Sequence, residues 1–301
     1  MRSSLAILIL AIATRLSAAD PLPLPTVLMR STFKIQGPAA VKGRRNLGTG
    51  FVMAQPDPSN PSQSHFVLVT ANHVLEHIVG AKATLLLRTA SGGEFQKLMY
   101  PITIRANAEP LWVRHPVADV AAMRVALPKQ ADLKLVSTNL LCTDQMLEQH
   151  QIGPGEELIV LGFPHGAEAN AAGFPILRSG RIASYPLTPT SKNTTFLLDF
   201  LVFPGNSGGP VFLYAPNRTY DEQKRPVTVQ FVMGLVSRAV NHTEHIKAPE
   251  GETTEKESLA LGVIVHASLI RETLERLPPP KQQPATEPLP VPRSAPAGSK
   301  G

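Results

Sequence analysis

Short apolar runs, each bounded by glycine, proline or polar residues, recur along most of the chain. Runs of this length with such boundaries are typical of β-strands rather than of long helices. The strand-like runs are 27–35, 48–53, 66–70, 83–88, 101–105, 118–125, 157–162, 176–182, 195–203, 227–236 and 259–265. The chain contains no internal repeat. The pattern therefore predicts an all-β, mostly antiparallel, barrel-like fold.

The segments between and after these runs lack a strand pattern. Residues 127–156 form a connection with weak helical patches, and 241–258 is polar and charged, as expected of a loop. Apolar positions 269, 270, 274 and 277 give a helical face, so we expect a helix over 268–277 with Ser268 as its N-cap. Residues 278–301 contain eight prolines and little that could pack. We expect a disordered tail there.

The N-terminus has the pattern of a secretory signal peptide. Arg2 precedes an apolar stretch from Leu5 to Thr14, and small residues lead to a cleavage site after Ala19. The stretch is too short to span a bilayer as a stable helix. We expect residues 1–19 to be removed and the mature protein to be secreted or periplasmic, with no membrane association afterwards.

Charge and cysteine content exclude some kinds of function and cross-link. The net charge of +6 is scattered, with no basic block and no aromatic stripe between basic residues, so nucleic-acid binding is not expected. Cys142 is the only cysteine, which excludes an intrachain disulfide. Its sequence surroundings suggest a buried or half-buried thiol without a catalytic role.

The segment 203–211 concentrates the candidate chemistry. Ser207 lies among Gly205, Gly208 and Gly209, between two strand-like runs. Glycine accepts positive φ, so such a loop can present a hydroxyl group and turn backbone N–H groups inward. A serine nucleophile with an oxyanion hole needs this geometry, although a glycine-rich turn would look similar.

A serine nucleophile also needs a base and a carboxylate that orients the base. His73 follows the run 66–70, and Asp119 enters the apolar run 118–125, where a carboxylate is costly to bury without a donor. Asp132 and Asp144 in the connection are weaker candidates for the acid. Asp199 suits a structural or pocket-wall role better.

Three motifs in this order resemble those of chymotrypsin-type (trypsin-like) serine peptidases. They are Thr70-Ala71-Asn72-His73, Asp119-Val120-Ala121-Ala122-Met123 and Gly205-Asn206-Ser207-Gly208-Gly209-Pro210. The similarity covers about 26–277 and is greatest to the bacterial HtrA-type branch. It implies two six-stranded barrels, at about 26–126 and 150–266 within a protease domain of 20–277, which meet at a catalytic cleft.

The resemblance also implies roles for single residues. Ser207 would attack a peptide carbonyl, His73 would transfer the proton, and Asp119 would orient the imidazole. The amides of Gly205 and Ser207 would bind the oxyanion. Polypeptides would be the substrates, with no cofactor and no metal, and the oligomeric state is left open.

Two departures from the family pattern affect activation and specificity. Asn206 replaces the aspartate by which many trypsins hold a new N-terminus, so no zymogen cleavage of that kind is expected. Leu201 stands six positions before the nucleophile, where trypsin has an acidic residue. With Leu201 and Ser237 as candidate substrate-binding residues, we expect an apolar or small-residue preference. A PDZ domain is common in the HtrA branch, but we do not expect one here, because the predicted protease domain is followed by the proline-rich tail.

Three other interpretations are weaker. His73, Glu76 and His77 match an H-x-x-E-H zinc motif, but glycine ends that segment within a turn. The serine loop matches the G-x-S-x-G of α/β-hydrolases, but a strand rather than a helix is predicted after it. A non-catalytic protein- or peptide-binding module on the same fold is the most serious alternative.

Overall fold

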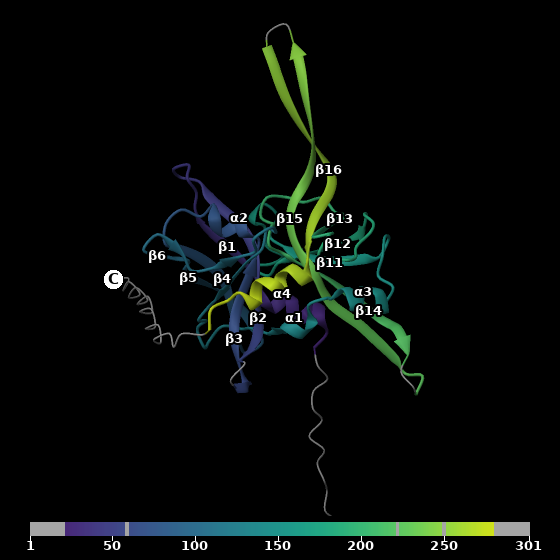
Figure 1. The fold of residues 1–301 in the computed structure, drawn as a ribbon. Coiled ribbons are helices and arrows are strands. Elements are labelled where there is room, and N and C mark those ends of the chain that lie inside the picture. Colours follow the sequence, from purple (N-terminus) through teal and green to yellow (C-terminus); the bar gives the residue numbers. More distant parts are fainter. Residues whose placement is uncertain (1–21, 58–59, 221–222, 249–250, 280–301) are drawn as a thin grey trace, which may run out of the picture.

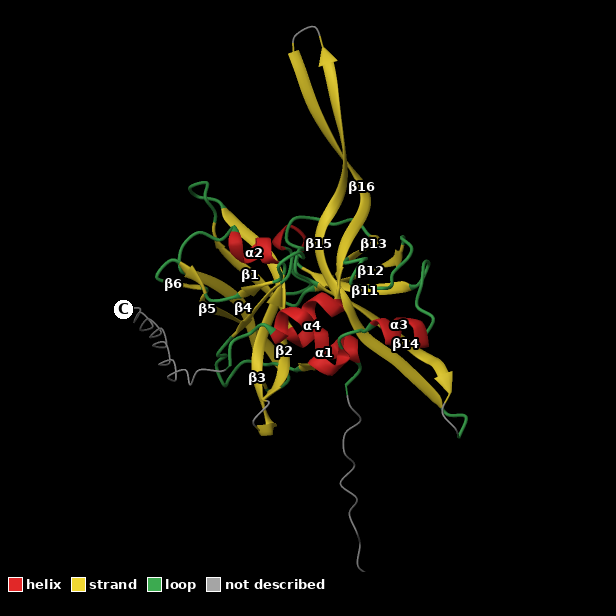
Figure 2. Cartoon of the chain, in the orientation of Figure 1, coloured by secondary structure: helices red, strands yellow, loops and turns green. Residues whose placement is uncertain are grey.

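The computed structural model describes residues 22–57, 60–220, 223–248 and 251–279. Strands predominate, as Figure 2 shows, and they form two β-structures that lie side by side. The predicted all-β, mostly antiparallel fold is confirmed. The signal peptide expected at 1–19 lies outside the described residues, as does the predicted tail from residue 280 onward.

The first β-structure is an eight-stranded sheet with the order β5-β4-β1-β2-β3-β9-β8, and β10 pairs in parallel with β2. Its strands are β1 (Thr32–Pro38), β2 (Arg45–Asp57), β3 (Asn60–Thr70), β4 (Lys82–Ser91), β5 (Glu94–Thr103), β8 (Val113–Arg114), β9 (Ala121–Arg124) and β10 (Val136–Ser137). A separate ladder joins β6 (Arg105–Ala106) and β7 (Glu109–Pro110).

This sheet differs in strand number from the expected six-stranded barrel. Among the described residues its hydrogen-bonded path runs from β5 to β8 without closing. Short strands such as β8 and β10, with two residues each, exist only because a longer neighbour supplies hydrogen-bond partners. Hydrophobic periodicity cannot detect strands of that length.

The second β-structure is the closed six-stranded barrel that was expected, with the order β11-β12-β13-β16-β15-β14. Its strands are β11 (Glu157–Gly162), β12 (Ile176–Ile182), β13 (Thr195–Asp199), β14 (Pro210–Tyr220), β15 (Pro226–Ala248) and β16 (Gly251–His266). The predicted bounds of β11 and β12 match the structure.

The segment 241–258, expected to be a loop, is instead a β-hairpin arm. Strands β15 and β16 continue their pairing from Asn241↔Ser258 to Ala248↔Gly251, and Figure 1 shows the arm projecting well beyond the barrel. The prediction failed because this segment has no apolar alternation. Its strands extend a ladder that begins inside the barrel, and backbone pairing alone gives no sequence signal.

Helices form the connections and the ends of the chain. They are α1 (Leu24–Ser31), α2 (Asn72–Glu76), α3 (Asp144–Gln149) and α4 (Ala267–Glu275), with 3₁₀ turns η1 (Thr138–Leu140) and η2 (Pro164–Gly166). No helix of the described ranges combines the length and the apolar content that a bilayer crossing requires.

The start of the run 27–35 is helical rather than extended. In α1, Leu24, Leu28 and Ser31 are buried at helical spacing, with Pro25 in the first turn. A short apolar run is compatible with the periodicity of a helix and with that of a strand. Tertiary contacts therefore decided between the two.

Helix α4 confirms the predicted terminal helix but begins one residue earlier. His266, and not Ser268, precedes its first turn, and the buried Ser268 Oγ has no partner within the described chain. The helix contacts β9 of the first sheet and β15 of the barrel. Buried apolar residues of both β-structures form one continuous core, which holds the two in a fixed relation.

Candidate active site

The first sheet contributes a histidine and an aspartate that hydrogen-bond each other. His73 is the second residue of α2, the short helix that follows β3. Asp119 comes shortly before β9, and β9 pairs with β3. His73 Nδ1 lies 2.8 Å from Asp119 Oδ2, and the His73 backbone N–H donates to Asp119 Oδ1 at 3.1 Å. The carboxylate therefore fixes both the ring and the backbone of the histidine.

A serine of the barrel completes the environment of this carboxylate. Ser237, buried on β15, donates its hydroxyl to Asp119 Oδ2 at 2.6 Å. Burial would raise the pKa of Asp119, but the hydrogen bonds from His73 and Ser237 outweigh it and hold that pKa below its ordinary value. The carboxylate is therefore ionised at neutral pH and oriented by three donors.

Ser207 lies in the loop between β13 and β14, against the same serine. Its hydroxyl donates to the Ser237 carbonyl at 2.9 Å. Within the described residues, no hydrogen bond joins Ser207 Oγ to the His73 ring. Ser237 nevertheless links Ser207 to Asp119 and His73 through consecutive hydrogen bonds, so the structure brings the three predicted residues into one cluster.

The backbone of the serine loop is held through its carbonyl groups. Five successive carbonyls, 203 to 207, each accept a hydrogen bond. In contrast, the N–H groups of Gly205 and Ser207 have no acceptor in the described part of the chain. Gly205 has a φ of +97°, and a Cβ there would collide with the Phe163 carbonyl. The loop thus presents two free amides, as an oxyanion hole requires.

Of the two candidate substrate-binding residues, Ser237 lies within the hydrogen-bonded cluster and Leu201 lies outside it. Ser237 belongs to the cluster, so its hydroxyl is engaged by Asp119. Leu201 is half-buried, its carbonyl accepts from Arg178 Nη1 at 2.7 Å, and no hydrogen bond joins it to the cluster within the described ranges. Beside it, Val202 faces Gly262 of β16 closely enough that a Cβ on Gly262 would touch its side chain. The Arg178 guanidinium also lies here, 4.4 Å from the centre of the Phe200 ring and 5.5 Å from that of Phe203, so the surroundings combine apolar side chains with one cation.

The other acidic candidates are engaged elsewhere. Asp132 pairs with Arg30, and Asp144 accepts from the Thr190 hydroxyl at 2.7 Å. Asp199 is exposed at the end of β13. Cys142 is buried, as expected, and burial raises the pKa of its thiol to about 12, which leaves it protonated and unreactive.

The alternative motifs find little support in the geometry. Helix α2 spans only five residues, and Asp119 already occupies His73 Nδ1. Among the described residues, no three His, Cys, Asp or Glu side chains are grouped so that they could share a metal ion. Strand β14 begins at Pro210, directly after the serine loop, whereas the α/β-hydrolase motif requires a helix there.

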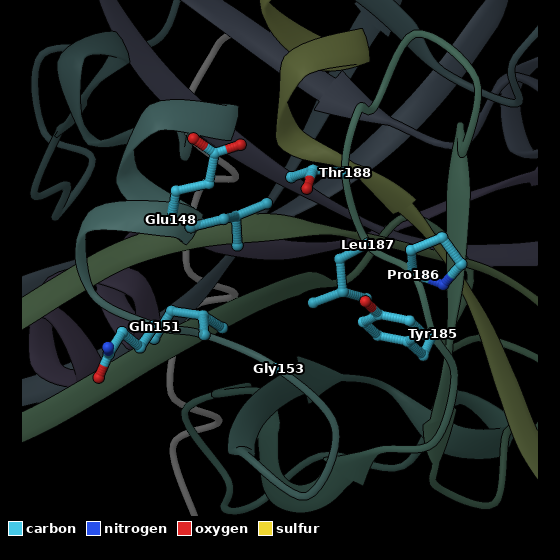
Figure 3. A pocket seen from close by; sticks show the side chains of 9 residues that line it. Glu148, Gln151, Gly153, Tyr185, Pro186, Leu187 and Thr188 are labelled. Carbon is cyan, nitrogen blue, oxygen red and sulfur yellow. The ribbon is translucent and has the colours of Figure 1, made fainter.

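Two pockets lie outside the hydrogen-bonded cluster. One, of about 200 Å³, is lined by α3 and the segment 185–188, and Figure 3 shows Tyr185 and Leu187 facing it across from Gln151. The other, of about 460 Å³, is lined by Asn72, Glu76, Trp112 and their neighbours, so it adjoins α2 next to His73.

The sequence did not indicate every residue of the site. Ser237 was proposed only for substrate contact, and its bond to Asp119 could not be foreseen because 118 positions separate them. Thr49, which donates to the Gly205 carbonyl at 2.6 Å, was missed as well. A threonine between two glycines, Gly48 and Gly50, was the only available signal.

Comparison with known proteins identifies the family. The sequence profile described as the trypsin-like peptidase domain matches residues 48–217, more than half of the chain, from β2 to β14. No curated protein matches the sequence.

Among solved structures, a serine endoprotease from Yersinia pestis is similar, with 14% identity, a TM-score of 0.44, and coverage of 85% of this chain and 67% of that one. Protease Anisep from Arthrobacter nicotinovorans has 14% identity and a TM-score of 0.45, over 82% and 94% of the two chains. The Rv3671c protease from M. tuberculosis has 19% identity and a TM-score of 0.40, over 89% and 87%. On the evidence of the family profile, the chain belongs to the trypsin-like peptidase domain family.

Proposed function

We propose that this protein is a serine endopeptidase that hydrolyses peptide bonds through Ser207, His73 and Asp119 and an acyl-enzyme intermediate. The observation that carries the proposal is the pairing of a fixed His73–Asp119 unit with two unbonded amides beside a serine hydroxyl.

The proposed reaction follows from the donor and acceptor roles. The neutral imidazole donates from Nδ1 to Asp119, which leaves Nε2 as the proton acceptor. In the reaction, Ser207 Oγ exchanges its hydrogen bond to the Ser237 carbonyl for one to His73 Nε2. As Oγ attacks the substrate carbonyl, its proton moves to His73, and the carbonyl oxygen becomes an oxyanion at the amides of Gly205 and Ser207.

Collapse of the tetrahedral intermediate breaks the C–N bond, and His73 gives its proton to the leaving amine. Water then attacks the acyl-enzyme with His73 again as the base, and this step releases the new carboxyl group and restores Ser207. Each oxyanion-hole donor is worth about 3–4 kcal/mol in related hydrolases.

The test compares the wild type with Ser207→Ala. The variant should fold normally and lose turnover by about a millionfold, the scale seen when such a nucleophile is removed. A fluorophosphonate probe should label the folded wild type and not the variant. Unlabelled, inactive, folded wild-type protein would instead support the non-catalytic binding module.

Polypeptides are the substrate class that a peptidase domain implies. We propose an apolar or small-residue preference at the primary pocket, because Leu201 stands where trypsin has an acidic residue. We also propose the HtrA-type branch as the nearest relative, on the three quoted motifs alone. Export through residues 1–19 is a further proposal, which N-terminal sequencing of exported protein would test: the mature chain should start at Asp20.

A further inference from the structure

The directions of the two free amides are set by the carbonyls of the preceding residues. A trans peptide group is planar, so its C=O and N–H point in opposite directions. The Pro204 carbonyl accepts from the His165 N–H at 2.6 Å, which turns the Gly205 N–H the other way. The Asn206 carbonyl accepts from the Gly209 N–H at 2.9 Å. The Ser207 N–H, in the same peptide group, therefore points in the opposite direction.

The peptide group between these two, which joins Gly205 to Asn206, differs because a side chain from the first sheet holds its carbonyl. The carbonyl of Gly205 accepts from Thr49 Oγ1 at 2.6 Å. Gly205 has no Cβ and a φ of +97°, so the backbone there rotates more freely than at other residues. Rotation at Gly205 would change the angle between the two oxyanion amides. Two hydrogen bonds oppose this rotation: the Asn206 N–H donates to the Phe203 carbonyl at 3.0 Å within the loop, and the Thr49 hydroxyl holds the Gly205 carbonyl from outside the loop.

Thr49 is fully buried on β2, and all its polar groups are used at this junction. Its N–H donates to the Ser207 carbonyl at 2.8 Å, and its hydroxyl oxygen accepts from the Phe163 N–H at 3.3 Å. Its carbonyl accepts from the Thr70 hydroxyl at 2.6 Å. A residue of the first sheet thus fixes three points of the barrel, two of them on the serine loop.

We propose that Thr49 is a positioning residue of the oxyanion hole: its hydroxyl, by holding the Gly205 carbonyl, keeps the amides of Gly205 and Ser207 aimed at one point. This inference rests on the proposed peptidase activity. In this view, a contact between the two β-structures determines how well the oxyanion hole binds the transition state. Thr49 itself touches neither substrate nor the reacting atoms.

Two substitutions separate the hydroxyl from the shape of the side chain. Thr49→Val keeps the branched shape and removes the donor, whereas Thr49→Ser keeps the donor. Thr273→Val is the matched control, because it removes an equally buried hydroxyl, bonded to the Leu269 carbonyl at 2.6 Å, in α4. All are compared with the wild type in full-length protein, after thermal unfolding has shown that each variant folds.

We expect Thr49→Val to lower kcat by about tenfold to a hundredfold, somewhat less than deletion of an oxyanion donor, with KM nearly unchanged. The inhibition constant of a peptide aldehyde, whose adduct places an oxygen in the hole, should rise by the same factor. The pH dependence of kcat should keep its shape. Thr49→Ser should retain at least half of wild-type kcat, and Thr273→Val should behave like the wild type.

Wild-type kcat and aldehyde binding in folded Thr49→Val would overturn the inference while leaving the peptidase activity intact. An equal loss in Thr49→Ser would also overturn it, because the hydroxyl would then not be the cause. If Thr49→Val does not fold, Thr49→Ala, which leaves space rather than a buried methyl group, is measured in the same way. A wild type without hydrolysis or probe labelling would remove the proposed function, and the role of Thr49 with it.

Discussion

His266 provides a pH-dependent contribution to stability whose size can be worked out from the structure. It is 2% exposed at the end of β16, its ring lies 4.8 Å from that of Phe196, and its Nε2 has no hydrogen-bond partner among the described residues. Burial lowers the pKa of His266 from 6.5 to about 4, although the charge of Asp144 acts in the opposite direction. The folded protein therefore keeps this imidazole neutral.

The sign and size follow from proton linkage. Between pH 6.5 and about 4, the unfolded chain binds a proton at His266 that the folded chain does not, so stability falls as the pH falls. The pKa difference between the unfolded and the folded chain corresponds to about 3 kcal/mol in the free energy of unfolding. About 2 kcal/mol of this contribution should be lost between pH 7 and pH 5.

The assay is urea unfolding at pH 7 and pH 5 for the wild type, His266→Phe and His242→Gln. His242 is an exposed histidine on β15 and serves as the control. The wild type and His242→Gln should lose about 2 kcal/mol more than His266→Phe over this interval. An equal loss in all three proteins would show that His266 is not kept neutral by the fold.

Three further predictions concern the candidate site. Gly205→Ala should abolish hydrolysis, because a Cβ there would collide with the Phe163 carbonyl and φ is +97°. Gly43→Ala is the control, since Gly43 has a φ of +80° but open space around it, and it should remain active. Measurement of kcat for both variants checks this. Asp119→Asn should lower kcat by about 10⁴-fold, because an amide no longer orients the His73 tautomer. This loss should appear without a comparable loss of stability, and an active Asp119→Asn would count against the proposed triad. Cleavage of a peptide library should occur mainly after apolar or small residues, read by mass spectrometry, and predominant cleavage after Lys or Arg would refute the assigned pocket.

The sequence by itself determined the β class, most strands of the barrel and the three residues of the candidate triad. Strand β11 of the barrel is an apolar run with clear boundaries, so its pattern needs no tertiary information. The motifs around His73, Asp119 and Ser207 are local as well, because each contains the residues that shape its own turn or strand entry.

The tertiary structure decided what depends on contact between distant segments. The arm of β15 and β16 arises from backbone pairing, and α1 from burial against neighbouring elements, so neither has a distinctive local pattern. Ser237 reaches Asp119, and Thr49 reaches Gly205, only because the two β-structures share one core. Hydrogen bonds that join residues more than a hundred positions apart leave no periodicity in the sequence, which is why only the folded chain reveals them.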